Sequence, residues 1–116
     1  GKSGADEIKQ IMEDFRSKPP HKLGGSPMEW VKDYSTLVAR NLLTGEEKKI
    51  DQKITSNVLQ FFTKDGTKIS VRPSGTEPKI KFYFEVKGEL NSREEFDLAE
   101  KTADKKIDAI MDELGL

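Results

Sequence analysis

The chain has 116 residues, a length typical of one domain, and we expect residues 1–116 to form a single domain. Charged residues make up 35% of the sequence and hydrophobic residues 34%, so the core must be small and strictly patterned. The formal net charge of −1 argues against a general nucleic-acid-binding or membrane-surface role, which usually needs a basic domain. The absence of cysteine excludes disulfide bonds and thiolate metal sites, and one histidine, His21, excludes a histidine-rich metal site.

The sequence contains no apolar run of the roughly 20 residues that a membrane-spanning helix requires. It also begins without the features of a signal peptide. We therefore expect a cytoplasmic protein with no membrane partner. Because the first residue is Gly1 rather than methionine, we expect the chain to be a fragment of a larger protein.

The first predicted element is an amphipathic helix that begins near Ser3 and ends before Pro19 and Pro20. Ser3 can cap the helix, and Asp6 places negative charge in its first turn, where the helix dipole favours it. The apolar residues that follow share one helical face and are Ile8, Ile11, Met12 and Phe15.

The next part of the chain is predicted less sharply. Residues 21–27 include two consecutive glycines and indicate a turn. Residues 30–38 mix apolar and polar side chains and predict one strand. Residues 44–53 are rich in charge and predict a solvated loop.

Three strands follow in quick succession. Residues 57–63 and 67–72 predict a hairpin, because Asp65-Gly66 between them is a strong turn signal. Residues 79–87 alternate regularly between apolar and polar side chains and predict the clearest strand of the chain.

The last predicted element is a second amphipathic helix over residues 92–115. A capping box at Ser92-Arg93-Glu94-Glu95 marks its start, and Gly115 marks its end.

The resulting fold class is α+β: a four-stranded antiparallel sheet with two helices packed on one face. The strand residues expected on the covered face are Ile69, Val71, Ile80, Phe82, Phe84 and Val86. The residues expected on the open face are Lys79, Lys81 and Tyr83.

Residues 71–81, V-R-P-S-G-T-E-P-K-I-K, form a polar turn between the last two predicted strands. Arg72 has a planar guanidinium suited to phosphate or carboxylate, and Gly75 can take a positive φ. Backbone N–H groups in such a bend can converge on an anion. Hydroxyl and ammonium groups nearby would add donors, from Ser74, Thr76, Lys79 and Lys81. The turn thus predicts an anion site.

A plain turn explains the same residues without a ligand. In that interpretation Arg72 pairs at the surface with Glu77 or Glu85, which contributes less than about 1 kcal/mol. The residues alone leave both interpretations open.

The run R-P-S-G-T-E-P-K-I-K-F-Y over residues 72–83 resembles the phosphate-binding motif in the C-terminal domain of the α-D-phosphohexomutases. The predicted order of elements agrees with that domain, which has a TBP-like sheet and two helices. The continuation after the second proline is closer to the bacterial phosphoglucomutase/phosphomannomutase members. The resemblance implies that Arg72, Ser74, Gly75, Thr76 and Lys81 bind the phosphate of the substrate that is not reacting.

The resemblance also implies an enzyme of four domains that interconverts hexose 1-phosphate and hexose 6-phosphate through a bisphosphate. Its partners would be the phosphosugar and the other three domains, and Mg²⁺ and a hexose 1,6-bisphosphate would serve the whole enzyme. The phosphoserine motif, the aspartate-rich metal loop and the sugar-recognition loop of the family are absent from this sequence. We therefore expect no catalytic residue, no metal ligand and no bound cofactor in this chain, and no activity of the isolated chain.

Two other functions remain as alternatives. An open sheet face with lysines resembles a platform for single-stranded nucleic acid. We expect no such role, because the phenylalanines alternate onto the covered face and leave only Tyr83 for stacking. A purely structural domain is the other alternative.

Trp30 is expected in packing rather than in sugar stacking, and His21 in a solvated loop.

Overall fold

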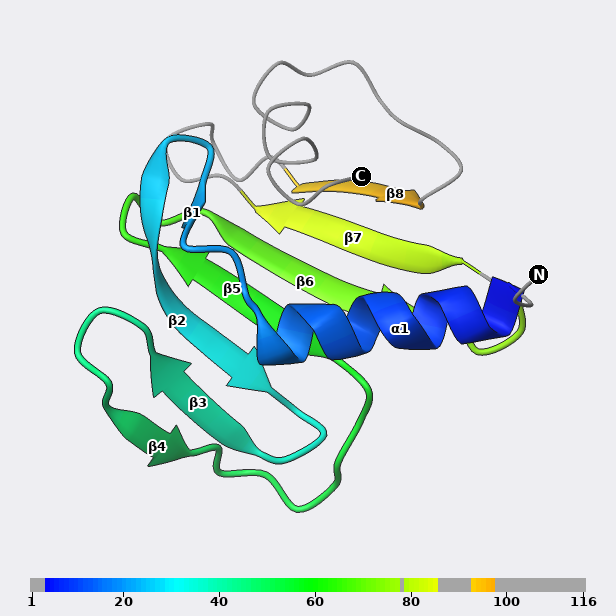
Figure 1. Cartoon of the computed structure of the whole chain (residues 1–116), viewed down its shortest axis with the longest axis horizontal. Coiled ribbons are helices and arrows are strands. Elements are labelled where there is room, and N and C mark those ends of the chain that lie inside the picture. Colours follow the sequence, from blue (N-terminus) through cyan, green and yellow to red (C-terminus); the bar gives the residue numbers. More distant parts are fainter. Residues whose placement is uncertain (1–3, 78, 86–92, 98–116) are drawn as a thin grey trace.

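The computed structural model describes residues 4–77, 79–85 and 93–97, and Figure 1 shows one helix lying against a twisted antiparallel sheet. The elements in chain order are α1 (Gly4–Ser17), β1 (Lys22–Leu23), β2 (Ser26–Asp33), β3 (Val38–Asn41), β4 (Glu47–Lys49), β5 (Leu59–Thr63), β6 (Lys68–Pro73), β7 (Ile80–Glu85) and β8 (Arg93–Asp97). The α+β class with an antiparallel sheet is therefore as predicted.

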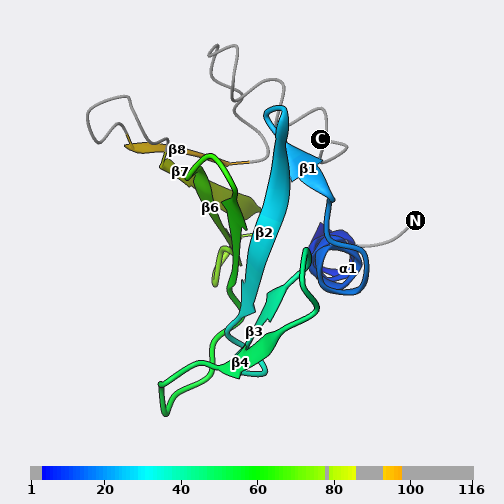
Figure 2. The same cartoon turned by 90° about the vertical axis from the view of Figure 1, so that its left-hand side faces the viewer.

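The strands lie side by side in the order β4-β3-β2-β5-β6-β7-β8, and β1 pairs with the start of β2. Every pairing is antiparallel. Figure 2 shows α1 on one side of the curved sheet, with none of the described elements on the opposite side of β5, β6 and β7. We call that opposite side the open face.

Helix α1 forms for the reasons that its sequence predicts. Acidic residues occupy its first turn and Arg16 its last turn, and both arrangements favour the helix dipole. Its apolar stripe is buried against the sheet, and the ring of Phe15 meets that of Phe61 edge-on with centroids 5.9 Å apart. The helix ends at Ser17, ahead of the two prolines.

The hydrophobic core lies between α1 and the central strands. Alternate residues of β5, β6 and β7 are fully buried, which confirms the predicted period of two. The buried strand residues at the core are Leu59, Phe61, Ile69, Val71, Ile80, Phe82 and Phe84. Val86 lies outside the described residues. The three predicted strands around the hairpin are confirmed, with ends that differ by one or two residues.

The prediction of one strand over residues 30–38 is wrong. Strand β2 ends at Asp33, and the chain turns before β3 begins at Val38. The turn forms because the Asp33 carboxylate accepts hydrogen bonds from the Ser35 N–H at 2.9 Å and from the Ser35 hydroxyl at 2.6 Å. Leu37 completes the turn with a φ of 59°.

The charged segment 44–53 is not entirely a loop. It contains β4, a fully exposed edge strand that pairs with β3. Charged side chains are common on edge strands because they discourage pairing with other chains. Trp30 of β2, expected in core or domain-interface packing, is not among the buried core residues. It lies half-buried on the open face, and the Lys48 ammonium lies 5.3 Å from its ring centroid.

The turn predicted over residues 21–27 is present at Gly24 and Gly25, which both have positive φ. It connects the short strand β1 to the first residues of β2, so part of that segment is strand rather than loop. His21 is exposed, as expected.

The second predicted helix is wrong over its first residues. Arg93–Asp97 form β8, which pairs along β7 in antiparallel register. Without β8, the edge of β7 would leave a row of backbone groups unpaired, and this tertiary demand outweighs the local capping signal. The remainder of the predicted helix, residues 98–115, lies outside the described residues. Among the described residues the sheet has eight strands rather than the four predicted.

Candidate functional site

A short connection joins β6 to β7, and hydrogen bonds of Ser74 hold its bend together. The Ser74 N–H donates to the Lys79 carbonyl at 2.8 Å. The Ser74 hydroxyl oxygen accepts from the N–H groups of Thr76 at 3.4 Å and Glu77 at 3.3 Å. Two backbone donors therefore converge on one oxygen atom. Both hydrogen bonds are long, so a stronger acceptor in the same place could replace that oxygen.

Gly75 corrects one detail of the prediction. Its φ is not positive, although the glycines that make turns elsewhere in the chain do have positive φ. The Ser74 hydroxyl closes the bend, so a left-handed residue is not needed. A Cβ at Gly75 would meet no atom within 4 Å. The unliganded fold therefore does not require glycine here, and a close approach by a ligand remains as a reason for it.

Arg72 and Lys81 lie directly opposite each other on β6 and β7. Like charges opposite each other across an antiparallel pair are unfavourable. Arg72 is exposed, and its guanidinium makes no hydrogen bond or ion pair with any described residue. Glu77, one of the partners that a plain turn would give Arg72, instead pairs with Lys79 at 3.5 Å. Arg72 is therefore the exposed cation beside the connection that can contact an anion.

The connection also forms one wall of a pocket of about 630 Å³, and the outer part of α1 forms the facing wall. Figure 1 shows the amino-terminal end of α1 near this connection. Three polar residues of α1 line the pocket, Lys9, Glu13 and Arg16. Asn57, which precedes β5, lines it as well. Sequence reasoning missed them, because only the fold brings α1 to residues 73–77.

The predicted site residues thus fall into two neighbouring groups. Ser74, Gly75 and Thr76 line the pocket beside α1. Arg72 and Lys81 belong to the open face of the sheet, at the end where the connection begins. Only Pro73 separates Arg72 from Ser74 along the chain, but the structure does not bring all five side chains into one cavity.

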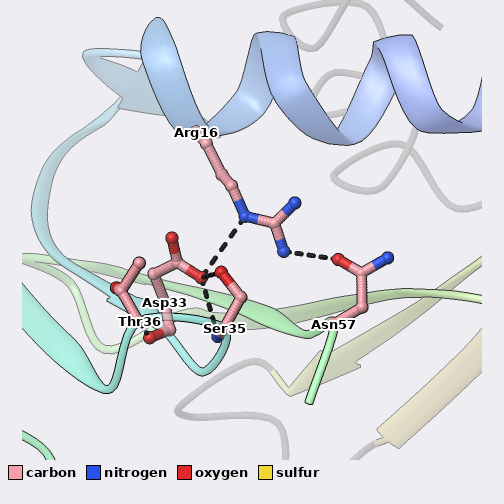
Figure 3. A network of polar contacts seen from close by, with 5 residues as sticks. All are labelled: Arg16, Asp33, Ser35, Thr36 and Asn57. Atoms are coloured by element: carbon pink, nitrogen blue, oxygen red, sulfur yellow. Dashed lines mark hydrogen bonds and ion pairs between the residues drawn. The ribbon is translucent and has the colours of Figure 1, made fainter. Parts of the chain in front are cut away.

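A polar network fastens the carboxyl end of α1 close to this pocket (Figure 3). The Arg16 guanidinium contacts the Asp33 carboxylate through Nε at 3.3 Å and also donates to the Asn57 side-chain oxygen. Partial burial alone would raise the pKa of Asp33. Hydrogen bonds from Ser35, followed by the charge of Arg16, outweigh burial and hold that pKa below its ordinary value.

Neither a cluster of metal-ligating side chains nor a membrane-spanning helix is found in the described ranges 4–77, 79–85 and 93–97. In those ranges no three histidine, cysteine or acidic side chains are grouped closely enough to hold a metal ion. No helix there combines the length and apolar character needed to cross a membrane.

Comparison with protein families gives a clear assignment. The family described as "Phosphoglucomutase/phosphomannomutase, C-terminal domain" matches residues 31–105. The chain belongs to this family. The match includes β3 to β8 and the whole connection between β6 and β7, and it begins after α1.

Individual relatives agree with that assignment. A phosphoglucomutase of Staphylococcus saprophyticus is 37% identical over 89 residues, which covers 77% of this chain and 16% of the relative. A phosphoglucomutase of Staphylococcus aureus strain MRSA252 is 39% identical over 87 residues, which covers 75% of this chain and 15% of the relative. The chain therefore spans about one sixth of the length of these relatives. No solved structure gives a significant match.

Proposed function

We propose that this domain binds the phosphate group of a phosphosugar through Arg72, Ser74, Gly75, Thr76 and Lys81. The observation that carries the proposal is the exposed Arg72 guanidinium beside a connection where two N–H groups converge on one oxygen, with Lys81 across the strand pair. A phosphate oxygen would accept from those N–H groups, and the guanidinium of Arg72 would bind a second phosphate oxygen.

The larger activity proposed for the protein is that of a phosphohexomutase. It would interconvert hexose 1-phosphate and hexose 6-phosphate through a bisphosphate, in the cytoplasm, with Mg²⁺ and the other three domains supplying the chemistry. This domain would hold the phosphate that is not reacting. Phosphoryl transfer depends mainly on positioning and charge stabilisation, so binding energy at the far phosphate would orient the reacting one. The isolated chain would be inactive.

The binding step can be tested on the chain itself. Backbone amide signals would be followed by NMR during titration with inorganic phosphate, with glucose as the uncharged comparison. We expect saturable shifts at Arg72, Ser74, Gly75 and Thr76 with phosphate and none with glucose. A few charge-assisted hydrogen bonds set against the cost of association give a dissociation constant on the order of 1 mM.

A matched pair of variants sharpens the test. Arg72→Ala removes the exposed guanidinium beside the connection, and we expect it to weaken phosphate binding at least about tenfold. Lys64→Ala removes an exposed cation from the hairpin at the other end of β6 and should leave binding unchanged. Equal affinities for both variants and the parent chain would contradict the proposed site.

A second candidate function is binding of single-stranded nucleic acid, and one observation favours it. The open face carries Trp30 and Phe62 in addition to Tyr83, so the expectation of one stacking residue is wrong. Lys32 and Lys68 lie 4.9 and 5.8 Å from the Phe62 ring centroid. Aromatic rings beside cations are the usual surface for stacked bases.

This candidate predicts that oligothymidylate quenches the fluorescence of Trp30 and that its affinity falls steeply with salt. Phe62→Leu should then weaken binding. No quenching at low salt would rule the candidate out.

A further inference from the structure

A hollow of about 300 Å³ lies on the open face, on the opposite side of the sheet from the pocket beside α1. Its side-chain lining combines one aromatic ring, neutral polar groups and charges of both signs. The polar and aromatic residues that line it are Gln60, Lys68, Ser70, Arg72, Tyr83 and Glu85. Its volume is at the lower end of the range for ligand pockets, which suits a molecule of monosaccharide size.

The strand register arranges these residues in rows across the sheet. Ser70 lies opposite both Gln60 and Tyr83, and Arg72 belongs to the next row on the same face. Residues two apart on a strand are about 7 Å apart. The hollow therefore has a cation for phosphate at one end and an aromatic ring with neutral hydrogen-bonding groups next to it.

The neutral groups are already held in place. The Tyr34 hydroxyl donates to the Gln60 side-chain oxygen at 2.9 Å, and the Gln60 amide donates to the Ser70 hydroxyl oxygen at 3.1 Å. The Ser70 proton and the second Gln60 amide proton are not used in these bonds. A ligand with hydroxyl groups can accept from both without disturbing the chain of hydrogen bonds.

The charges at the other end argue against a second anion. Glu85 lines the hollow opposite Lys68, so a carboxylate lies beside the cation at the end of the hollow away from Arg72. A carboxylate can also accept hydrogen bonds from the hydroxyl groups of a sugar. The Tyr83 ring lines the hollow, and an aromatic ring can stack against the C–H side of a sugar ring.

We propose that this hollow is a subsite for the sugar ring of a hexose monophosphate, with Tyr83 beneath the ring and Ser70, Gln60 and Glu85 at its hydroxyl groups. The inference rests on the proposed function, because it takes Arg72 as the phosphate ligand. It adds that this domain contacts the sugar as well as the phosphate. Binding to the chain should therefore distinguish a hexose phosphate from phosphate alone.

The test compares two probes, glucose 1-phosphate and inorganic phosphate, titrated into the 116-residue chain and followed by the amide signals and the Tyr83 ring signals. We expect glucose 1-phosphate to bind about fivefold more tightly than phosphate and to shift the Tyr83 ring, since an aromatic contact contributes on that scale. Tyr83→Leu should lower the affinity for glucose 1-phosphate to that for phosphate and leave phosphate binding unchanged.

Phe62→Leu is the matched control, because Phe62 is an aromatic residue of the same face that does not line the hollow. It should change neither affinity. Ser70→Ala is a second variant in case Tyr83→Leu fails to fold, and it should weaken only the sugar phosphate, about threefold. Equal affinities of the parent chain for the two probes, with phosphate still bound at Arg72, would overturn the subsite and leave the phosphate site intact. No binding of either probe would overturn both proposals.

Discussion

The Arg16 guanidinium lies 3.3 Å from the carboxylate of Asp33, and this contact fastens the last turn of α1 to the end of β2. The same carboxylate oxygen accepts two hydrogen bonds from Ser35. Asp33 therefore closes the turn after β2 and also anchors the helix that walls the pocket beside residues 73–77.

The first prediction concerns this carboxylate and pH. The pKa of Asp33 is lower in the folded chain than its ordinary value of about 3.9, so the ionised carboxylate stabilises the fold. That contribution is complete above the unfolded pKa and is lost as the pH falls through the folded pKa. Asp33→Asn should cost about 1 kcal/mol at pH 7 and progressively less as the pH falls below about 4.

Urea unfolding of both proteins at several pH values measures this difference. Asp51→Asn serves as the control, because the exposed Asp51 side chain has no hydrogen bond or ion pair to the described residues. A constant difference between the parent chain and Asp33→Asn across the acid range would contradict the role given to Asp33.

The second prediction separates folding from binding at Gly75. Space around Gly75 is open and its φ is not positive, so Gly75→Ala should leave the free energy of unfolding unchanged or raise it by up to about 1 kcal/mol. A methyl group on this exposed residue would obstruct a phosphate that approaches the backbone. We expect phosphate binding, measured by NMR titration, to weaken about tenfold. Full binding by a stable variant would show that phosphate does not approach the backbone at this residue.

The third prediction concerns the Ser74 hydroxyl, which accepts the N–H groups of Thr76 and Glu77. Ser74→Ala should cost less than about 1 kcal/mol of stability, because both hydrogen bonds are long and exposed. It should nevertheless weaken phosphate binding several-fold, since the bend that aligns the N–H groups loses its closing contact. Ser56→Ala, at an exposed serine that does not line the pocket, should affect neither quantity. An unchanged affinity in Ser74→Ala would remove Ser74 from the site.

The fourth prediction tests which face of the sheet is the core. Phe61 is fully buried against Phe15, whereas its neighbour Phe62 lies half-buried on the open face under two lysines. Phe61→Ala should cost about 3–5 kcal/mol through lost burial and the cavity that remains. Phe62→Ala should cost no more than about 1 kcal/mol, chiefly from the lost cation–π contacts. Denaturant unfolding of the two variants decides the question, and similar losses would contradict the assignment of faces.

The helix and the three strands around the hairpin could be predicted from the sequence, because each has a clear period and a clear stop signal. Phe82 and Phe84 alternate with Lys81 and Tyr83, and nothing but a strand with one buried face fits that pattern. The residues of the candidate site were accessible for the same reason, since the R-P-S-G-T-E-P run is contiguous in the chain.

The parts that the sequence did not reveal depend on contacts between distant segments. Strand β4 has a fully charged sequence and exists because β3 offers a free edge, and β8 pairs with β7 despite a capping box. The wall that α1 contributes through Lys9 and Glu13 depends on how the helix crosses the sheet. No local sequence pattern determines the angle at which α1 crosses the sheet.

The opposition of Arg72 and Lys81 has a consequence for the thermal behaviour of the domain. Arg72 is exposed and lies across the strand pair from Lys81, so a dianion bound there would stabilise the folded chain by mass action. The melting temperature should therefore rise with phosphate concentration by more than with chloride at equal ionic strength. Replacing Arg72 with a neutral residue should abolish that response.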